Sequence, residues 1–259
     1  MVSDIQYAYL GMYDFPTLRP AQNTWWKGLA GHFRARGLSK VPNDLNRSVS
    51  DPYDLWQASN LFFAQTCGYP LTHRLAGKVQ LIGTPCYDAP GCQGPQYRSL
   101  FIAGPDSAIE NLASMLPARI AINAKDSFSG WRTVCSVVDN IDMDGEPFSE
   151  VVISGSHAKS IDLVREGKAD IAAIDCVTHA LIGDVEPGRL EGTRIVEQGP
   201  LAPGLPYITR ANMDAQDIRA MTKAVEDAFI NPELADARQT LRLIDFDFVP
   251  LSQYVRIMK

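Results

Sequence analysis

Residues 154–175, SGSHAKSIDLVREGKADIAAID, decide the fold class of this chain. Ser156 precedes a helical pattern, and Gly167 follows the last periodic residue, as expected where a helix ends. Residues 171–174 then form a short apolar run, which is typical of a fully buried parallel strand. The stretch therefore predicts a polar turn, a helix and a buried strand that ends on Asp175.

The same stretch has the chemistry of a ligand site. Small hydroxylated residues at a helix start leave backbone N–H groups pointing outward, and such groups bind anions. Asp175 lies at the carboxyl end of a strand, where ligand sites of open α/β sheets occur. An ordinary βαβ unit with a capped helix explains the pattern equally well, because helix caps are common. The stretch alone leaves both interpretations open.

The composition excludes several classes of protein. The chain has 259 residues, which suits one large or two medium domains with a sizeable core. Its 46% hydrophobic and 21% charged residues are those of an ordinary soluble globule. A net charge of −6 argues against nucleic acid or an anionic membrane as a partner. No apolar run reaches the roughly 18 residues that a membrane span needs, so we expect no membrane insertion.

The first residues, MVSDIQYAYLGMYD, resemble the start of a strand rather than a targeting segment. They contain no basic n-region, no apolar h-region and no cleavage site, so we expect no export signal in the chain as given. A mature or trimmed form of an exported protein would look the same. A cytoplasmic location therefore stays open.

Predicted strands and helices alternate along the chain. We expect strands at residues 5–10, 61–65, 79–84, 97–103, 119–123, 151–153, 171–174 and 193–197. We expect helices at residues 23–36, 109–115 and 129–138, after residues 154–156, and after the caps Asp214 and Asn231. This alternation predicts an α/β fold with mixed, mainly parallel sheets flanked by helices.

Two segments rich in glycine and proline suggest how the chain divides. They lie at residues 103–106 and 198–206. A chain that leaves one lobe at the first segment and returns at the second would form lobe 1 from residues 1–103 and 206–259, and lobe 2 from residues 104–205. Two crossover hinge segments would then allow closure over a ligand. Two unrelated surface loops explain the same segments.

The five cysteines do not form a disulfide framework, because their number is odd in a chain of this size. Cys86 and Cys92 bracket a loop rich in glycine and proline, and an oxidising compartment would allow a local bridge between them. Cys135 and Cys176 fall on apolar patterns and are expected to be small core residues. The spacing fits no common zinc pattern, so we expect no metal site.

Five motifs carry a resemblance to a known family. They are AQTCGYP (64–70), GTPCYDAPGC (83–92), KDSFSGW (125–131), SGSHAKSIDLVREGKADIAAIDCVTHAL (154–181) and APGLPYIT (202–209). The chain resembles type 2 periplasmic binding proteins, specifically the phosphate, phosphite and phosphonate group of ABC transporter substrate-binding proteins. The resemblance implies two α/β lobes that close on a small anionic solute, an ABC transporter permease as partner, no cofactor and a periplasmic location.

The resemblance also implies an anion site at a hydroxyl-rich helix start. Members carry Ser-Thr-Ser-Gly there, and this chain has Ser127, Phe128, Ser129 and Gly130. Both serines and the glycine keep the hydroxyl and backbone donors that an anion needs. Phe128 replaces one hydroxyl donor by an aromatic surface, which departs from the pattern of simple phosphonate binders.

Two further positions match the family's binding residues. His157, next to Ser156 at the helix start, is expected to donate to an oxyanion; a helix-start side chain that is satisfied within the protein is the alternative. Asp175 matches an acid that meets the ammonium group in aminoalkylphosphonate binders, and its buried charge would need such a partner. We therefore expect a ligand with an anion and also a ring or an amine.

The other lobe is expected to supply the opposite wall of the site. Tyr13, Gln65, Thr66 and Tyr69 lie at the predicted carboxyl ends of their strands. Each alone is more often a core or rim residue, but their shared position at strand ends favours contact with a ligand. A tyrosine can stack on a flat ligand and form a hydrogen bond with its hydroxyl. Tyr87, in the loop that contains Cys86 and Cys92, is a candidate for the lip of the cleft.

Two other functional classes remain open. No common catalytic motif such as GxSxG or HExxH occurs. The same fold nevertheless hosts cytoplasmic enzymes of menaquinone and thiamine-pyrimidine biosynthesis, and fold does not decide function. A ligand-sensing domain would bind a solute equally well but would signal to a partner.

Overall fold

The structure is a computed structural model that describes residues 6–105, 114, 117–139 and 145–257. The chain divides into two compact units. Unit 1 comprises Met1–Asp88 and Pro203–Ile257, and unit 2 comprises Ala89–Ala202. Each unit contains its own five-stranded sheet with helices. The predicted α/β class is therefore confirmed.

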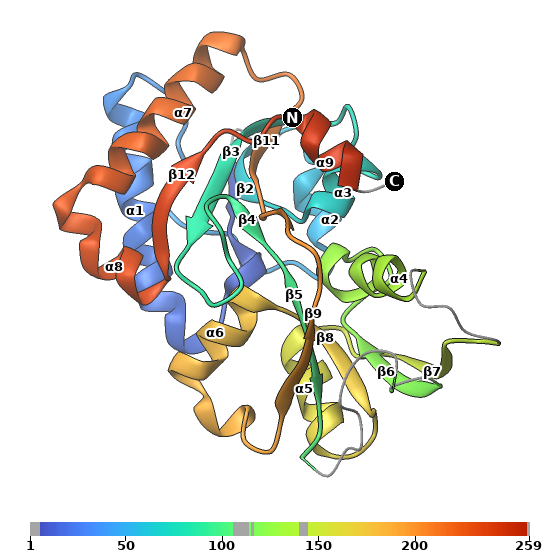
Figure 1. Ribbon diagram of the computed structural model, residues 1–259. Coiled ribbons are helices and arrows are strands. Elements are labelled where there is room, and N and C mark those ends of the chain that lie inside the picture. The colour runs from blue at the N-terminus through green and yellow to red at the C-terminus, as the bar shows by residue number, and fades with distance from the viewer. Residues whose placement is uncertain (1–5, 106–113, 115–116, 140–144, 258–259) are drawn as a thin grey trace. The chain divides into compact units, whose positions relative to one another are not determined.

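Unit 1 is built on a mixed sheet in the order β1-β2-β11-β3-β12 (Figure 1). These strands are β1 (Tyr7–Tyr9), β2 (Leu61–Gln65), β3 (Val79–Tyr87), β11 (Tyr207–Arg210) and β12 (Leu243–Asp247). β1 and β2 are parallel, whereas β11 runs antiparallel to both of its neighbours. β12 is antiparallel to β3. A two-stranded sheet pairs β4 (Gln96–Tyr97) with β10 (Ala202–Pro203).

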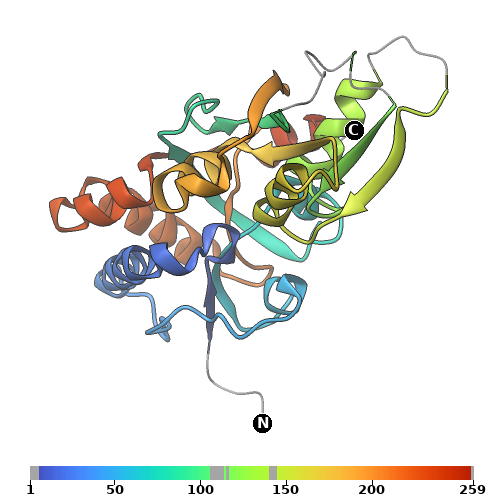
Figure 2. The same ribbon diagram turned by 90° about the horizontal axis from the view of Figure 1, so that it is seen from below.

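Helices cover both faces of the unit 1 sheet. They are α1 (Arg19–Ala35), α2 (Pro52–Trp56), α3 (Gly68–Thr72), α7 (Ala215–Ile230), α8 (Ala235–Thr240) and α9 (Leu251–Ile257), with single 3₁₀ turns η1 (Gly11–Tyr13), η2 (Pro16–Leu18) and η6 (Pro232–Leu234). Figure 1 shows α1, α7 and α8 on one side of the sheet and α2, α3 and α9 on the other. Both views show α1 beside α7 (Figures 1 and 2), and the rings of Trp25 and Phe229 join them at 5.0 Å.

Unit 2 is built on a second mixed sheet, in the order β7-β6-β8-β5-β9. Its strands are β5 (Ser99–Ala103), β6 (Ala118–Ile122), β7 (Phe148–Ile153), β8 (Ile171–Asp175) and β9 (Arg194–Gln198). Its helices are α4 (Thr133–Val138), which follows the π-helical turn η4 (Phe128–Arg132), α5 (His157–Arg165), α6 (Cys176–Val185) and the 3₁₀ turn η5 (Pro187–Arg189). Phe101, Ile120, Val134 and Ile171 belong to the buried cluster that packs against one face of this sheet.

The structure confirms the elements predicted for residues 154–175. Ser156 caps α5, and Gly167 has φ +66°, a backbone conformation that glycine adopts without strain. All five residues of β8 are buried. β8 is parallel to β6 but antiparallel to β5, so the predicted parallel pairing holds on one side only.

Both sheets contain more antiparallel pairing than the alternation of elements predicts. In the described residues, the parallel pairs are β1–β2, β6–β7 and β6–β8. The antiparallel pairs are β5 with β8 and β9, β11 with β2 and β3, and β12 with β3. The mainly parallel character that the pattern predicts is therefore replaced by a mixed arrangement.

The division of the chain also differs from the predicted boundaries at residues 103 and 205. Residues 99–103 were expected in lobe 1, yet β5 pairs with β8 and β9 in the sheet of unit 2. The chain therefore enters unit 2 before β4, after Asp88, and leaves it at Ala202. The helix predicted at residues 109–115 lies almost entirely outside the described residues. No helix within the described residues is long and apolar enough to cross a membrane.

Candidate functional site

The turn η4 in unit 2 contains three of the predicted binding residues, Phe128, Ser129 and Gly130, and directly follows a fourth. Ser127 caps it, and the Ser127 hydroxyl oxygen accepts a hydrogen bond from the Gly130 amide at 3.1 Å. The Ser127 carbonyl accepts from the amides of both Trp131 and Arg132. The first N–H groups of such a helical segment have no acceptor within the segment, which is the property that makes helix starts bind anions.

Gly130 leaves room for a neighbouring side chain. A β-carbon at this position would clash with the Asn123 side-chain oxygen, which would have to move, and would lie 3.2 Å from the Ser127 hydroxyl oxygen. Phe128 is 4% exposed, with its ring 6.3 Å from the ring of Tyr97. The residue that replaces a hydroxyl in the motif is therefore a buried packing residue, and it offers little aromatic surface to a ligand.

A chain of hydrogen bonds joins this turn to the start of α5. The Ser129 hydroxyl lies 3.0 Å from Nε2 of His157, and Nδ1 of His157 lies 3.1 Å from the Ala173 carbonyl on β8. The Ser129 carbonyl accepts from the Ser99 hydroxyl on β5 at 2.8 Å. Two strands of the sheet, β5 and β8, therefore fix the positions of Ser129 in η4 and His157 in α5.

His157 is neutral near pH 7, because desolvation lowers its pKa to about 4. A carbonyl can only accept, so Nδ1 carries the hydrogen and donates it to Ala173. Nε2 then has a lone pair and accepts from the Ser129 hydroxyl. In this state His157 has no N–H for an oxyanion, which differs from its expected role as a donor.

Ser156 and Asp175 act as helix caps in the structure. The Ser156 hydroxyl oxygen accepts from the Lys159 amide at 3.2 Å. One carboxylate oxygen of Asp175 accepts from the amides of Val177 and Thr178, at 2.7 and 3.0 Å, at the start of α6. Asp175 is 2% exposed, and these donors stabilise its charge. The buried charge thus has donors within the protein, and contact with a ligand ammonium group stays a prediction.

In unit 1, Tyr87 brings two of the predicted residues together. The Gln65 amide nitrogen donates to the Tyr87 hydroxyl and to the Leu205 carbonyl, both at 3.0 Å. The Tyr13 ring packs edge-on against the Tyr87 ring, with centroids 5.3 Å apart. Tyr87, expected only at a lip, thus connects Tyr13 with Gln65.

The other two predicted residues of unit 1, Thr66 and Tyr69, follow the end of β2. Thr66 is fully buried, and its hydroxyl has no hydrogen-bond partner among the described residues. Tyr69 on α3 stacks on His73 at 3.8 Å. Ligand contact by Tyr13, Gln65, Thr66 and Tyr69 stays a prediction.

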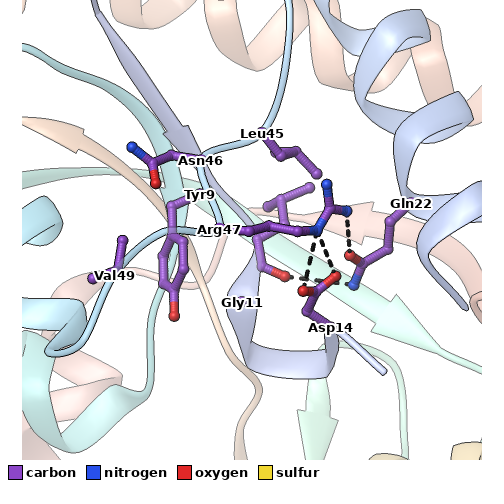
Figure 3. A pocket seen from close by; sticks show the side chains of 9 residues that line it. Tyr9, Gly11, Asp14, Gln22, Leu45, Asn46, Arg47 and Val49 are labelled. Carbon is purple, nitrogen blue, oxygen red and sulfur yellow. Dashed lines mark hydrogen bonds and ion pairs between the residues drawn. The ribbon is translucent and has the colours of Figure 1, made fainter. Parts of the chain in front are cut away.

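Unit 1 also contains a polar pocket of about 170 Å³ at the end of β1 (Figure 3). The pocket is lined by Tyr9, Leu10, Gly11, Asp14, Gln22, Leu45, Asn46, Arg47 and Val49. The Arg47 guanidinium binds both carboxylate oxygens of Asp14, at 2.9 and 3.1 Å, and also donates to the Gln22 side chain. Sequence reasoning missed this pocket because Arg47 lies in a loop without a periodic pattern. The charged groups of the pocket, Asp14 and Arg47, are already paired with each other.

The cysteines are arranged differently from the expected local bridge. All five lie within the described residues, and none of them is in a disulfide bond. Cys86 is buried on β3 in unit 1. Cys92 instead lies against Cys176, with their sulfur atoms 3.6 Å apart. The described residues contain no group of three His, Cys, Asp or Glu side chains that could hold a metal ion.

Comparison with known proteins gives a family match and several similar folds. The model of a family described as the periplasmic substrate-binding protein of phosphonate ABC transporters matches residues 58–253. No curated protein matches the sequence.

Three solved structures illustrate the structural similarity. A binding-protein component of an ABC phosphonate transporter from Pseudomonas aeruginosa is 17% identical, with a TM-score of 0.77 over 98% of this chain and 83% of that chain. PhnD1 from Prochlorococcus marinus, in complex with methylphosphonate, is 13% identical, with a TM-score of 0.75 over 98% and 96%. A Xanthomonas citri protein bound to chloride ion is 14% identical, with a TM-score of 0.76 over 99% and 96%. At these identities the structures support a shared fold.

Proposed function

Because the chain belongs to the family of phosphonate-binding, periplasmic substrate-binding proteins of ABC transporters, we propose that it binds a small phosphonate or a related tetrahedral oxyanion in unit 2. The proposed site comprises the turn that Ser127 caps and the start of α5. The hydrogen bond between Ser129 and His157 carries the proposal, since it joins the first residues of two helical segments that lie 28 residues apart in sequence.

The two helical starts suit an anion with several oxygen atoms. Each start presents backbone N–H groups and the positive end of a helix dipole. The Ser127 hydroxyl accepts from Gly130, and a hydroxyl that accepts can still donate its own hydrogen. Donors to a charged oxygen form shorter and stronger hydrogen bonds than donors to a neutral one. A tetrahedral oxyanion would therefore find donors from both sides.

His157 and Ser129 would respond together when the anion binds. A negative charge within a few ångströms raises the pKa of a histidine, so binding favours proton uptake by His157. Its Nε2–H would then donate to the Ser129 oxygen, and the Ser129 hydrogen would turn towards the ligand. The pair that is internally satisfied in the free protein would thus become a donor pair.

We also propose a role in uptake without a chemical step. Members of this family are binding proteins, so the partner would be the permease of an ABC transporter and the compartment would be the periplasm. Methylphosphonate recovered unchanged after prolonged incubation with the protein would agree with binding alone. Its consumption would support the enzyme alternative, and cell fractionation would test the compartment.

Calorimetric titration with methylphosphonate, phosphate and phosphite tests the proposed site. Ser129→Ala removes one hydroxyl donor, and a hydrogen bond to a charged group contributes about 1.5–3 kcal/mol, so affinity should fall roughly 10- to 100-fold. Ser136→Ala is the matched control, because its hydroxyl donates to the Thr133 carbonyl within α4. Equal affinities of the two variants, or no binding of any of the three anions by the folded wild type, would overturn the proposal.

A further inference from the structure

Two cysteines of unit 2 meet although they lie 84 residues apart in sequence. Cys92 belongs to the loop between β3 and β4, and Cys176 is the first residue of α6, directly after Asp175. Their sulfur atoms are 3.6 Å apart, which is contact distance for two thiols. Neither thiol belongs to a metal-binding cluster within the described part of the chain. The proposed anion site does not use either of them.

Backbone contacts on both sides hold the two thiols together. The Cys92 amide donates to the Ala89 carbonyl at 2.9 Å, and the Cys176 amide donates to the Arg98 carbonyl at 3.1 Å. Gly91 allows the loop to come this close, because a β-carbon there would lie 3.0 Å from the Cys176 β-carbon. Its φ of +105° also favours glycine. The approach of the two sulfur atoms is therefore a feature of the folded loop.

The two thiols differ in their access to solvent. Cys176 is fully buried, whereas Cys92 is partly exposed. A dissolved oxidant would therefore reach Cys92 first, and Cys176 would be the second, resolving thiol. Disulfide bonds form in oxidising compartments such as the bacterial periplasm, which is the compartment of this family.

We propose that Cys92 and Cys176 are the site of a disulfide bond, formed by exchange with a small-molecule disulfide such as oxidised glutathione. The Cys92 thiolate attacks one glutathione sulfur, forms a mixed disulfide and releases the first glutathione thiolate. The Cys176 thiolate then attacks the Cys92 sulfur and releases the second. Two protons leave the protein thiols and are taken up by the two glutathione thiolates. The oxidant is reduced by two electrons, and the cysteine pair is oxidised by two.

The bond would tie the loop at residues 89–92 to the first residue of α6. Asp175 caps the same helix, so the link would hold the loop next to that carboxylate. It would also close a long segment of unit 2, and a cross-link of this kind restricts the unfolded chain. The midpoint of thermal unfolding should therefore rise by several degrees on oxidation.

The experiment uses the full chain, reduced, freed of reductant and incubated with oxidised glutathione at pH 8. After alkylation and proteolysis, mass spectrometry should find a peptide pair that links Cys92 to Cys176, and the count of free thiols should fall from five to three. The hydrogen bond to Cys176 and burial raise the pKa of Cys92, so the rate should increase about 10-fold per pH unit between pH 7 and pH 8.

Two variants separate this pair from general oxidation. Cys176→Ala removes the resolving thiol, so Cys92 should stop at the glutathione adduct. Cys135→Ala, on α4, is the matched control and should still lose two thiols. A stable glutathione adduct on wild-type Cys92, a link from Cys92 to Cys86, or five free thiols after the same treatment would each overturn the proposal.

Discussion

His157 is harder to protonate in the folded chain than in the unfolded chain, so the stability of the fold depends on pH. Desolvation lowers its pKa to about 4, whereas a histidine in an unfolded chain titrates near its ordinary value of about 6.5. As pH falls below that value, the unfolded chain takes up a proton before the folded chain does. The contribution of neutral His157 to the free energy of unfolding is therefore fully present above pH 6.5 and is lost as the pH falls from 6.5 to 4.

His157→Asn should remove this part of the acid sensitivity. The free energy of unfolding of the wild type should decrease towards pH 4 more steeply than that of the variant. The difference in slope should be a fraction of the roughly 1.4 kcal/mol per pH unit that a fully excluded proton gives, because His157 is only partly buried. Urea unfolding at several pH values measures it. Parallel curves for the two proteins would contradict the assignment of a neutral His157.

Two substitutions of Asp175 distinguish its capping role from a ligand role. Asp175→Ala removes the acceptor for the Val177 and Thr178 amides and should cost about 1–2 kcal/mol of stability. Asp175→Asn keeps a capping acceptor and should cost far less. In calorimetry, Asp175→Asn should weaken an aminoalkylphosphonate more than methylphosphonate if the carboxylate meets an ammonium group. Equal losses for both ligands would exclude that role.

The sequence predicted where several site residues lie in their elements, but it did not predict which residues they contact. Ser127, Ser129 and Gly130 could be placed at a helix start because hydroxyl and glycine signals are local. The hydrogen bond from Ser129 to His157 depends on which strands are neighbours. The capping role of Asp175 depends on a backbone turn after β8 that an apolar pattern does not encode. Arg47 lies in a loop without a periodic pattern, so the sequence did not indicate the pocket that it lines.

At the scale of elements, α1 illustrates how packing overrides helix propensity. Gly28 faces the turn η6, where a β-carbon would lie 2.4 Å from a Leu234 methyl carbon. Gly31, three residues later on the same helix, has no atom within 4 Å of such a β-carbon. The two glycines are therefore a matched pair with opposite surroundings.

We expect opposite signs from alanine at these two positions. Gly31→Ala should raise the free energy of unfolding by about 0.5–1 kcal/mol, because alanine favours a helix over glycine. Gly28→Ala should lower it by about 1–3 kcal/mol, because the overpacking against Leu234 exceeds that gain. Chemical denaturation of both variants measures the difference. Stabilisation by both substitutions would show that Leu234 yields without cost.

Elements with strong local signals were predictable, whereas their partners were not. The cap, the glycine stop and the apolar run of residues 154–175 specified α5 and β8 correctly. β5 was predicted as a strand but assigned to the other lobe, because its partners β8 and β9 lie about 70 and 95 residues further along the chain. Strand pairing over such separations leaves no mark in a local pattern.

At the scale of the whole molecule, unit 2 is one continuous segment that contains all strands of its sheet. Unit 1 is assembled from two separate segments. A continuous segment with its own sheet and core meets the usual requirements of an independently folding domain.

A fragment of residues 89–202 should therefore fold on its own. Circular dichroism should show both helix and strand, and urea should unfold the fragment in one cooperative transition. A fragment of residues 1–88 is the control, because it lacks β11 and β12 of its sheet and should remain unfolded. A non-cooperative transition of fragment 89–202 would show that unit 2 depends on the rest of the chain.

The position of Trp131 has a spectroscopic consequence. The chain has four tryptophans, and Trp131, in η4, is the one within unit 2. It is partly exposed and packs against the buried cluster of that unit. The fluorescence emission of its indole ring therefore depends on the polarity around the turn that Ser127 caps. After replacement of Trp25, Trp26 and Trp56 by phenylalanine, the emission maximum would report occupancy of the proposed anion site without any added dye.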